Sequence, residues 1–405
     1  MSLIRGMSDT YTSHQTGSTR NMQIVRLLSV CMVLPSIVWF PFGPDHFELP
    51  KAMLLIGFVC AGISVLCIYP PKNIRVDAVF CFLLCLLVCS HGLAFVTSID
   101  TSLSLSGVAY RYGGFVTHLF LLLWTGLLYV YWSNVPRTQQ DIFYVMYIYT
   151  IGIICVMACV SGIIPIGPFQ MEYFDSRVFG LIGNPNTLAL LTFLGILFVH
   201  RTATRHKKIF WYVLFSLTII LTGSKVVCGL LFLFFFILMV QSKKNLPYVA
   251  ALFLCLLGAV VLAPRVFLLS LESESVRERL ALYATAYTHV AEVPVFGFGQ
   301  DTQSALLTMW DGQIHEGAII DRFHSEIFEV LFTRGWFGLC VTAAFLVYTY
   351  VCAWRARMFT ALLALVSIHM FVLVHFHTIS TLVLYSVLVV FIHSSYLQYR
   401  RFLLL

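Results

Sequence analysis

Residues 78–96 read AVFCFLLCLLVCSHGLAFV, a stretch that contains no Asp, Glu, Lys or Arg. About 20 apolar residues in a helix cross the hydrocarbon core of a bilayer. Because lipid offers the backbone no hydrogen bonds, only helices and closed barrels can span it. The stretch is continuously apolar rather than alternating, which excludes a barrel strand and predicts a membrane-spanning helix.

The same pattern recurs along the whole chain. Its 405 residues are 60% hydrophobic and 11% charged, and the mean hydropathy of +0.89 excludes an ordinary soluble globule. We therefore expect an all-α polytopic membrane protein, a single membrane domain over residues 1–405 with one large loop at 271–334 that contains short helices. About twelve apolar runs predict the transmembrane helices: 24–41, 52–69, 78–96, 115–132, 142–165, 187–200, 209–222, 226–241, 247–269, 335–353, 358–375 and 378–397.

The distribution of charge predicts the orientation in the membrane. With an inside N-terminus and twelve crossings, the inward-facing segments carry 16 of the 25 basic residues, and their only acidic residues are Asp9, Asp77 and Asp141. Because loops rich in Lys and Arg stay in the cytoplasm, we expect both termini there and the large loop in the periplasm, as in a multi-pass protein of a bacterial inner membrane. The first apolar run lacks a signal-peptide cleavage site and is interpreted as the first span. The basic residues share no single surface, so we expect a lipid bilayer and no nucleic acid as partner.

The cysteines argue against a metal or disulfide framework. All twelve lie in the predicted spans, and no two form a CxxC pair. Cys81, Cys85 and Cys89 recur every four residues, which can indicate a metal stripe, but small side chains packing between helices explain the spacing better. We expect no cofactor and no metal.

The large loop is the only large polar segment in a chain that is otherwise mostly apolar, and its most informative stretch is Arg322-Phe323-His324-Ser325-Glu326. Its first part, Ser275–His289, has the pattern of a helix with Ser275 as N-cap and Glu278 three residues on. An apolar stripe follows helical spacing in Leu280, Tyr283, Ala284 and Tyr287. Pro294–Gly299 predicts a turn, Met309–Ile320 an irregular segment, and the residues after His324 a helix that leads into Gly335.

Three other connections are expected on the same side of the membrane as the large loop. They end in Tyr110-Arg111-Tyr112-Gly113-Gly114, in Arg177 through Asn186, and in the corner Thr222-Gly223-Ser224-Lys225. Connections on one face can converge, so their polar residues are candidates for a shared site.

An ordered set of motifs resembles a known family. It comprises Gly183-Asn184-Pro185-Asn186, then Gly-Ser-Lys at 223–225, then Ser-x-Arg-x-Arg-Leu at 275–280 with Pro-Val-Phe-Gly-Phe-Gly at 294–299, and then His324 before Gly335-x-x-Gly338. Over residues 105–345 this order is similar to the O-antigen ligase and polymerase family.

The resemblance implies a metal-independent, inverting glycosyltransferase of the GT-C type. It implies transfer of a glycan from an undecaprenyl-pyrophosphate donor to a hydroxyl of a lipid or glycan acceptor at the periplasmic face. In this resemblance His324 positions or deprotonates the acceptor, and Arg279 holds the pyrophosphate. Lys225 stands where the family has an arginine, and Ser325 stands where an asparagine commonly follows the histidine.

The residue types fit that chemistry. A pyrophosphate leaving group needs cations near its developing charge, and histidine titrates in a range that suits a base. No acidic metal-binding DxD motif occurs in the sequence. The candidate substrate-binding residues are Arg279, Lys225, Arg277, Arg177, Arg111, Asn184, Asn186 and Arg322, and Asp321 or Glu326 are candidates to orient the His324 imidazole.

Other interpretations stay open. His324 also fits an exposed loop histidine, Arg279 an ion pair with a neighbouring glutamate, Lys225 an interfacial lysine, and Gly183–Asn186 a simple turn. His375 and His377 are expected to cap helix ends, and His91 and His118 rank lower because no motif converges on them. Besides ligase and polymerase, the alternatives are a transporter and a scaffolding relative; the nearly uncharged spans argue against transport.

Overall fold

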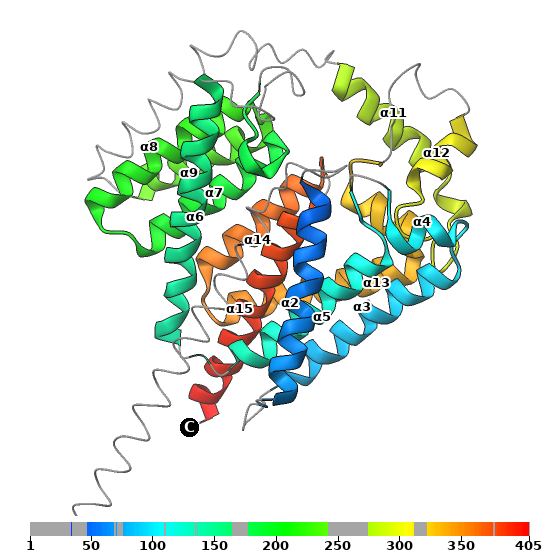
Figure 1. Cartoon of the computed structure of the whole chain (residues 1–405), viewed down its shortest axis with the longest axis horizontal. Coiled ribbons are helices and arrows are strands. Elements are labelled where there is room, and N and C mark those ends of the chain that lie inside the picture. The colour runs from blue at the N-terminus through cyan, green and yellow to red at the C-terminus, as the bar shows by residue number, and fades with distance from the viewer. Residues whose placement is uncertain are drawn as a thin grey trace, which may run out of the picture.

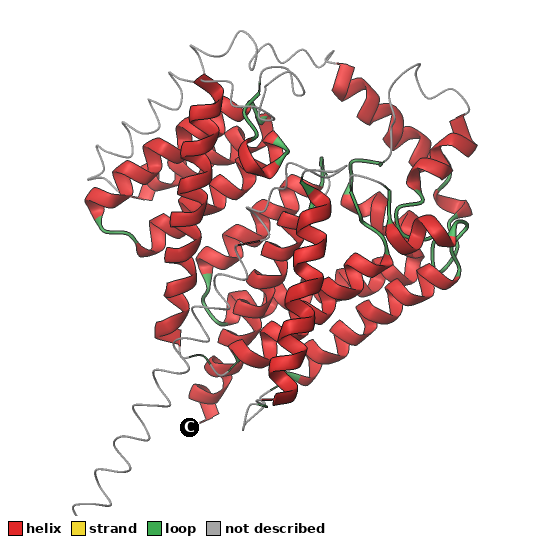
Figure 2. Ribbon diagram, viewed as in Figure 1, coloured by secondary structure: helices red, strands yellow, loops and turns green. Residues whose placement is uncertain are grey.

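A computed structural model of the chain describes residues 47–68, 76–108, 111–133, 137–163, 177–241, 274–311, 322–375 and 377–404, with the single residues 34, 70 and 135. Over these ranges every regular element is helical (Figure 2), with thirteen α-helices and two short 3₁₀-helices. The all-α prediction is confirmed for this part of the chain.

Figure 1 labels the helices, which run as follows: α2 Glu48–Ile68, α3 Ala78–Val96, α4 Thr101–Ser106, α5 Phe115–Trp132, α6 Arg137–Ile163, η4 Gly180–Ile182, α7 Pro185–Thr202, α8 Arg205–Thr222, α9 Lys225–Gln241, α11 Glu274–Thr288, η5 Val290–Glu292, α12 Gln303–Asp311, α13 Glu326–Arg355, α14 Phe359–Val372 and α15 Ile379–Leu404.

Ten of the predicted runs coincide with these helices, while 24–41 and 247–269 lie outside the described residues. Within the described ranges, six helical segments are long and apolar enough to cross a membrane: Glu48–Ile68, Ala78–Val96, Phe115–Trp132, Asp141–Val160, Glu326–Arg355 and Ile379–Arg400. The chain is therefore a multi-pass helical membrane protein, and the number of twelve spans stays a prediction.

The helices pack in two groups that share a border (Figure 1). In one group α7 lies among α6, α8 and α9, and all its residues from Leu188 to Val199 are buried. In the other, α15 packs against α5, α13 and α2, and α3 packs against α13 and α5. Helix α14 contacts α7 as well as α13 and α15, which joins the groups.

A backbone junction fastens the large loop to a kink in α13. Phe298 N–H donates to the Phe332 carbonyl at 2.8 Å, and Phe337 N–H donates to the Val295 carbonyl at 3.0 Å. At the junction Gly297 and Gly335 have positive φ angles of 78° and 69°, and a Cβ on either would meet backbone atoms within 2.5 Å. Only glycine suits both positions. The predicted turn and the helix leading into Gly335 are confirmed.

Parts of the loop differ from the sequence prediction. Helix α11 begins at Glu274, so Ser275 lies inside the helix rather than at its N-cap. Leu280 and Tyr287 are 59% and 76% exposed, whereas Leu282 and Ala286 are buried. The predicted stripe is wrong because α11 packs its other face on the apolar cluster formed with α12 and α13.

Two further expectations are corrected. Residues 309–311, expected to be irregular, end helix α12, and 312–320 lie outside the described residues. In the cysteine stripe, Cys81 is half-buried but Cys85 and Cys89 are exposed, because they lie on the outer side of α3. The expected packing between helices is therefore wrong for Cys85 and Cys89.

Candidate active site

His324 lies in the turn that leads into α13, directly before the N-cap residue Ser325. Its backbone is in the left-handed region with φ 53°. A non-glycine residue seldom adopts this conformation unless the surroundings hold it there. The Tyr283 hydroxyl of α11 donates to the His324 carbonyl at 2.8 Å. The loop helix thus sets where this histidine sits.

The His324 imidazole is surrounded by positive charge. Burial, followed by the charges of Arg279, Arg111 and Arg322, lowers its pKa from 6.5 to about 4. Each of these effects disfavours the protonated ring. His324 is therefore neutral at pH 7 and keeps a ring nitrogen lone pair that can accept a proton.

Arg279 connects α11 to the turn between α14 and α15. Its Nη1 donates to the Val374 carbonyl at 2.9 Å, and the side chain is half-buried. Its charge acts on both His324 and His375. Arg279 and His324 thus come from different elements and lie close enough for the arginine charge to act on the imidazole.

Arg322 belongs to a buried ion-pair network. Its Nη2 lies 2.9 Å from Asp301 Oδ1, and its Nη1 lies 3.4 Å from Glu329 Oε2. Asp301 Oδ2 also accepts from the backbone N–H groups of Val108 and Gly113, each at 3.0 Å. The guanidinium is held by two carboxylates, so it fastens three segments together.

Arg111 is carried by the segment that Asp301 holds. This segment turns at Tyr112, whose φ is 53°, and Arg111 lines a cavity beside Arg322. Arg111 also acts electrostatically on His324. The first outward connection and the large loop therefore converge as expected.

Arg177 and the two asparagines build the start of α7. Arg177 Nε donates to the Thr222 carbonyl at 2.8 Å, and its Nη2 donates to Asn186 Oδ1 at 2.7 Å. Asn184 is the N-cap, and its Oδ1 accepts from the N–H groups of Asn186 and Thr187. These contacts agree with a turn that starts a helix, and they tie that turn to the 222–225 corner.

The remaining candidates have different surroundings. Lys225 is exposed as the first residue of α9, and Arg277 is exposed on α11. Glu326 Oε2 lies 3.6 Å from His377 Nε2, which makes His377 its neighbour. Asp321 lies outside the described residues.

A cavity of about 170 Å³ extends from this network into the bundle. Its charged and polar lining residues include Arg111, His118, Asp301, Arg322, Glu326, Glu329, Arg334 and His377. Its apolar lining residues include Leu84, Leu87, Leu121, Leu122, Val330, Phe345, Leu346 and Leu382. A cavity lined by both charged and hydrocarbon side chains suits an amphipathic ligand.

His91 is a buried polar residue beside the candidate site that the motifs missed. Its Nε2 lies 3.1 Å from Arg334 Nη1, its Nδ1 lies 2.9 Å from Gln300 Nε2, and its ring stacks on His118 at 4.6 Å. The expectation that no other polar group converges on His91 and His118 is therefore wrong. The available signal was a polar residue within an apolar span, which often marks function.

The comparisons with known proteins agree with the motif order. Residues 210–343 match the family model described as O-antigen ligase, and this range contains Lys225, Arg279, Arg322 and His324. The comparisons with curated proteins and with solved structures gave no match. Over residues 210–343 the chain is therefore similar to the O-antigen ligase family.

Proposed function

We propose that this chain is a membrane glycosyltransferase that moves a glycan from an undecaprenyl-pyrophosphate donor to an acceptor hydroxyl at the periplasmic face. The observation that carries the proposal is a neutral histidine, His324, surrounded by the charges of Arg279, Arg111 and Arg322. A base next to cations is what proton removal and pyrophosphate departure require in one place.

The proposed reaction follows from these positions. His324 accepts the proton of the acceptor hydroxyl, whose oxygen attacks the anomeric carbon of the donor sugar. The bond from that carbon to the pyrophosphate oxygen breaks on the opposite face, which inverts the configuration. Its electron pair leaves with the lipid pyrophosphate, whose charge Arg279 and Arg111 stabilise. The chemistry needs no ion beyond these guanidinium groups.

The cavity supports a lipid-linked substrate. It is lined by Arg111 and Arg322 and by leucine and phenylalanine side chains, and the charge of both arginines acts on His324, which does not itself line the cavity. In this proposal the charged head group lies between these arginines and His324, and hydrocarbon packs on the apolar lining. Ligase and polymerase share this chemistry and differ only in the acceptor, which is a separate lipid or glycan for the first and the lipid-linked glycan itself for the second.

The test is transfer by purified, reconstituted protein supplied with an undecaprenyl-pyrophosphate glycan and with either class of acceptor. The product mass shows which acceptor is used. His324→Ala is expected to lower transfer by about 10²- to 10⁴-fold, the usual contribution of a general base.

His289→Ala is the matched control. His289 lies in the same loop but pairs with Glu292 on the surface, at 2.9 Å. This variant is expected to keep transfer within about twofold, because its histidine lies outside the cluster around His324. Undiminished transfer by folded His324→Ala protein would refute the proposed role of His324.

A further inference from the structure

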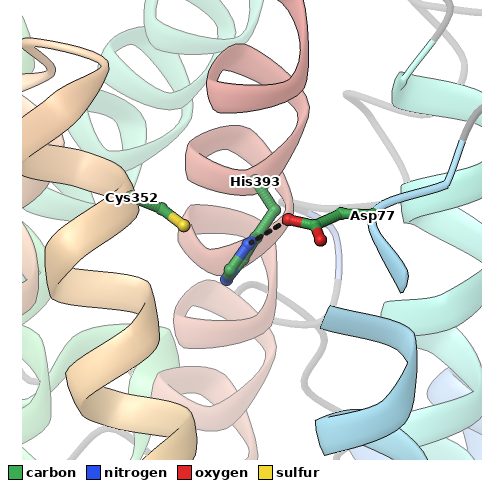
Figure 3. A group of neighbouring side chains, drawn as sticks. All are labelled: Asp77, Cys352 and His393. Atoms are coloured by element: carbon green, nitrogen blue, oxygen red, sulfur yellow. Dashed lines mark ion pairs between the residues drawn. The ribbon is translucent and has the colours of Figure 1, made fainter. Parts of the chain in front are cut away.

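Three buried side chains meet far from His324, where the last turn of α13 lies beside the middle of α15. Asp77 precedes α3, Cys352 lies in the last turn of α13, and His393 lies on α15 (Figure 3). Their relative exposures are 4%, 0% and 0%. One Asp oxygen, the Cys sulfur and one His nitrogen all lie within 4.8 Å of one another. The proposed glycan transfer uses none of the three.

The hydrogen bonds of Thr349 determine which nitrogen of His393 carries the proton. The Thr349 hydroxyl donates to the Phe345 carbonyl at 2.8 Å, so its oxygen is an acceptor for His393 Nε2, which lies 3.1 Å away. A neutral imidazole has one N–H, and here it is Nε2–H. The bare Nδ1 is buried and has no hydrogen-bond partner among the described residues.

Asp77 presents an acceptor to that bare nitrogen. Its Oδ1 caps α3 by accepting from Val79 N–H at 3.1 Å, and its Oδ2 accepts from the Tyr348 hydroxyl at 2.5 Å. Oδ2 lies 4.0 Å from His393 Nδ1, beyond the roughly 3.2 Å limit of an N–H···O bond. Two acceptors therefore face each other with Cys352 beside them.

We propose that Asp77, Cys352 and His393 bind a divalent cation of the zinc type. A tetrahedral ion with bonds of about 2.0–2.3 Å separates its ligand atoms by roughly 3.3–3.6 Å, so small side-chain movements complete the site. The thiol of Cys352 releases its proton on binding. One thiolate, one carboxylate and a neutral imidazole then balance the two positive charges, which a buried site requires.

The donor set favours zinc over harder cations. Ca²⁺ and Mg²⁺ require several oxygen ligands, whereas sulfur and imidazole nitrogen suit zinc. Three protein ligands leave the fourth position to water. Tyr348 and Thr349 hold the carboxylate and the imidazole in place, as outer-shell partners do at metal sites.

The site joins the N-cap of α3, the last turn of α13 and the middle of α15, and it lies apart from the transfer chemistry. Between Gly335 and Cys352, α13 runs roughly 25 Å at 1.5 Å per residue. A cation held by the α3 cap, α13 and α15 stabilises the bundle at the end remote from His324. Three protein ligands with an open position are the usual pattern of catalytic zinc, but the distance from the transfer chemistry leads us to assign the ion a stabilising role.

The test is metal content. The full chain is purified in detergent after expression with supplied Zn²⁺, dialysed, and measured by mass spectrometry of the metal. About one Zn²⁺ per chain is expected for the wild type, with thermal unfolding shifted downward by a strong chelator. In the Co²⁺-loaded protein a thiolate-to-cobalt absorption band is expected, which reports on the sulfur ligand directly.

Cys352→Ser and Asp77→Asn are expected to lose the bound metal, and Asn keeps the ability to cap α3. Cys155→Ser is the matched control, since Cys155 is equally buried but lies on α6. It is expected to retain the metal. Transfer by folded Cys352→Ser protein is expected to match the wild type. Wild-type protein without bound zinc, or zinc retained by Cys352→Ser, would overturn the proposal.

Discussion

The cations considered for the site fall into two groups that differ in their burial and their partners. In the inner group, Arg322 is paired with two carboxylates and Arg334 lies against His91, and both side chains are buried. In the outer group, Lys225 and Arg277 are exposed. Arg279 is half-buried, and its one hydrogen bond among the described residues goes to the Val374 carbonyl.

The difference distinguishes buried arginines that hold the fold together from more exposed cations that are candidates to bind a ligand. A buried cation needs a fixed partner to offset the loss of its hydration, and that partner occupies its donors. A guanidinium has five N–H donors, and the described residues engage only one of those of Arg279. Of the cations chosen from the sequence, Arg279 therefore combines closeness to His324 with available donors.

Breaking the inner group should have the largest effect on folding. Asp301→Ala leaves the buried Arg322 charge without its closest partner, which costs about 3–5 kcal/mol. Thermal unfolding of the detergent-purified protein is the measurement. Asp100→Ala is the control, since Asp100 is exposed and only caps α4, at a cost of about 1 kcal/mol. Equal losses in the two variants would contradict the scaffold role.

Replacing Arg279 by a neutral residue should change the transfer activity and its pH dependence. Arg279→Gln is expected to lower transfer by about 10²-fold, because one charge at the leaving group is lost. His324 must be neutral to accept a proton, so transfer falls as the pH drops through its pKa. In a plot of transfer rate against pH, this fall on the acidic side (the acid limb) is expected to have its midpoint near pH 4 in the wild type. It is expected to rise toward pH 6.5 in Arg279→Gln, because a cation that lowers the His324 pKa is gone.

Arg277→Gln controls for the change in net charge, since this exposed arginine lies two residues away on the same helix. Its acid limb should match that of the wild type. If both variants moved the limb equally, a general surface charge effect would replace the specific role of Arg279.

The smallest effect is expected at Lys225. In Lys225→Ala the affinity for the lipid-pyrophosphate donor should fall by roughly fivefold, about the free energy of one hydrogen bond. Lys225→Arg should preserve or raise the affinity, because a guanidinium can bind phosphate through two N–H groups. Titration with a fluorescent donor analogue measures both. Equal affinities in all three proteins would make Lys225 an interfacial anchor only.

Several elements were predictable because they depend on local composition. Long apolar runs are helical in lipid regardless of what surrounds them, so ten runs coincide with helices. The glycine pattern of Pro294–Gly299 and Gly335 marks backbone positions that other residues cannot occupy, and it predicted the turn although not its junction with α13. His324, Arg279, Arg111 and Arg322 were all chosen from the sequence, and the fold brings them together.

The wrong predictions concern which side chains are buried and which distant residues they contact. The buried face of α11 was misplaced because its partner, the apolar cluster with α12 and α13, comes from residues more than twenty positions away. His91 was ranked too low because Arg334 and Gln300 reach it from the far end of the chain.

By itself the sequence determined the helical membrane class, the set of candidate cations and the resemblance to a family. Those properties follow from apolar length and from the order of motifs along one chain. Only the tertiary structure decided that Arg322 is paired with Asp301 while Arg279 keeps donors available, and that Asp77, Cys352 and His393 meet. Whether a charge binds a ligand or a neighbour depends on which distant groups lie within about 3 Å of it, and that distance exists only in the folded chain.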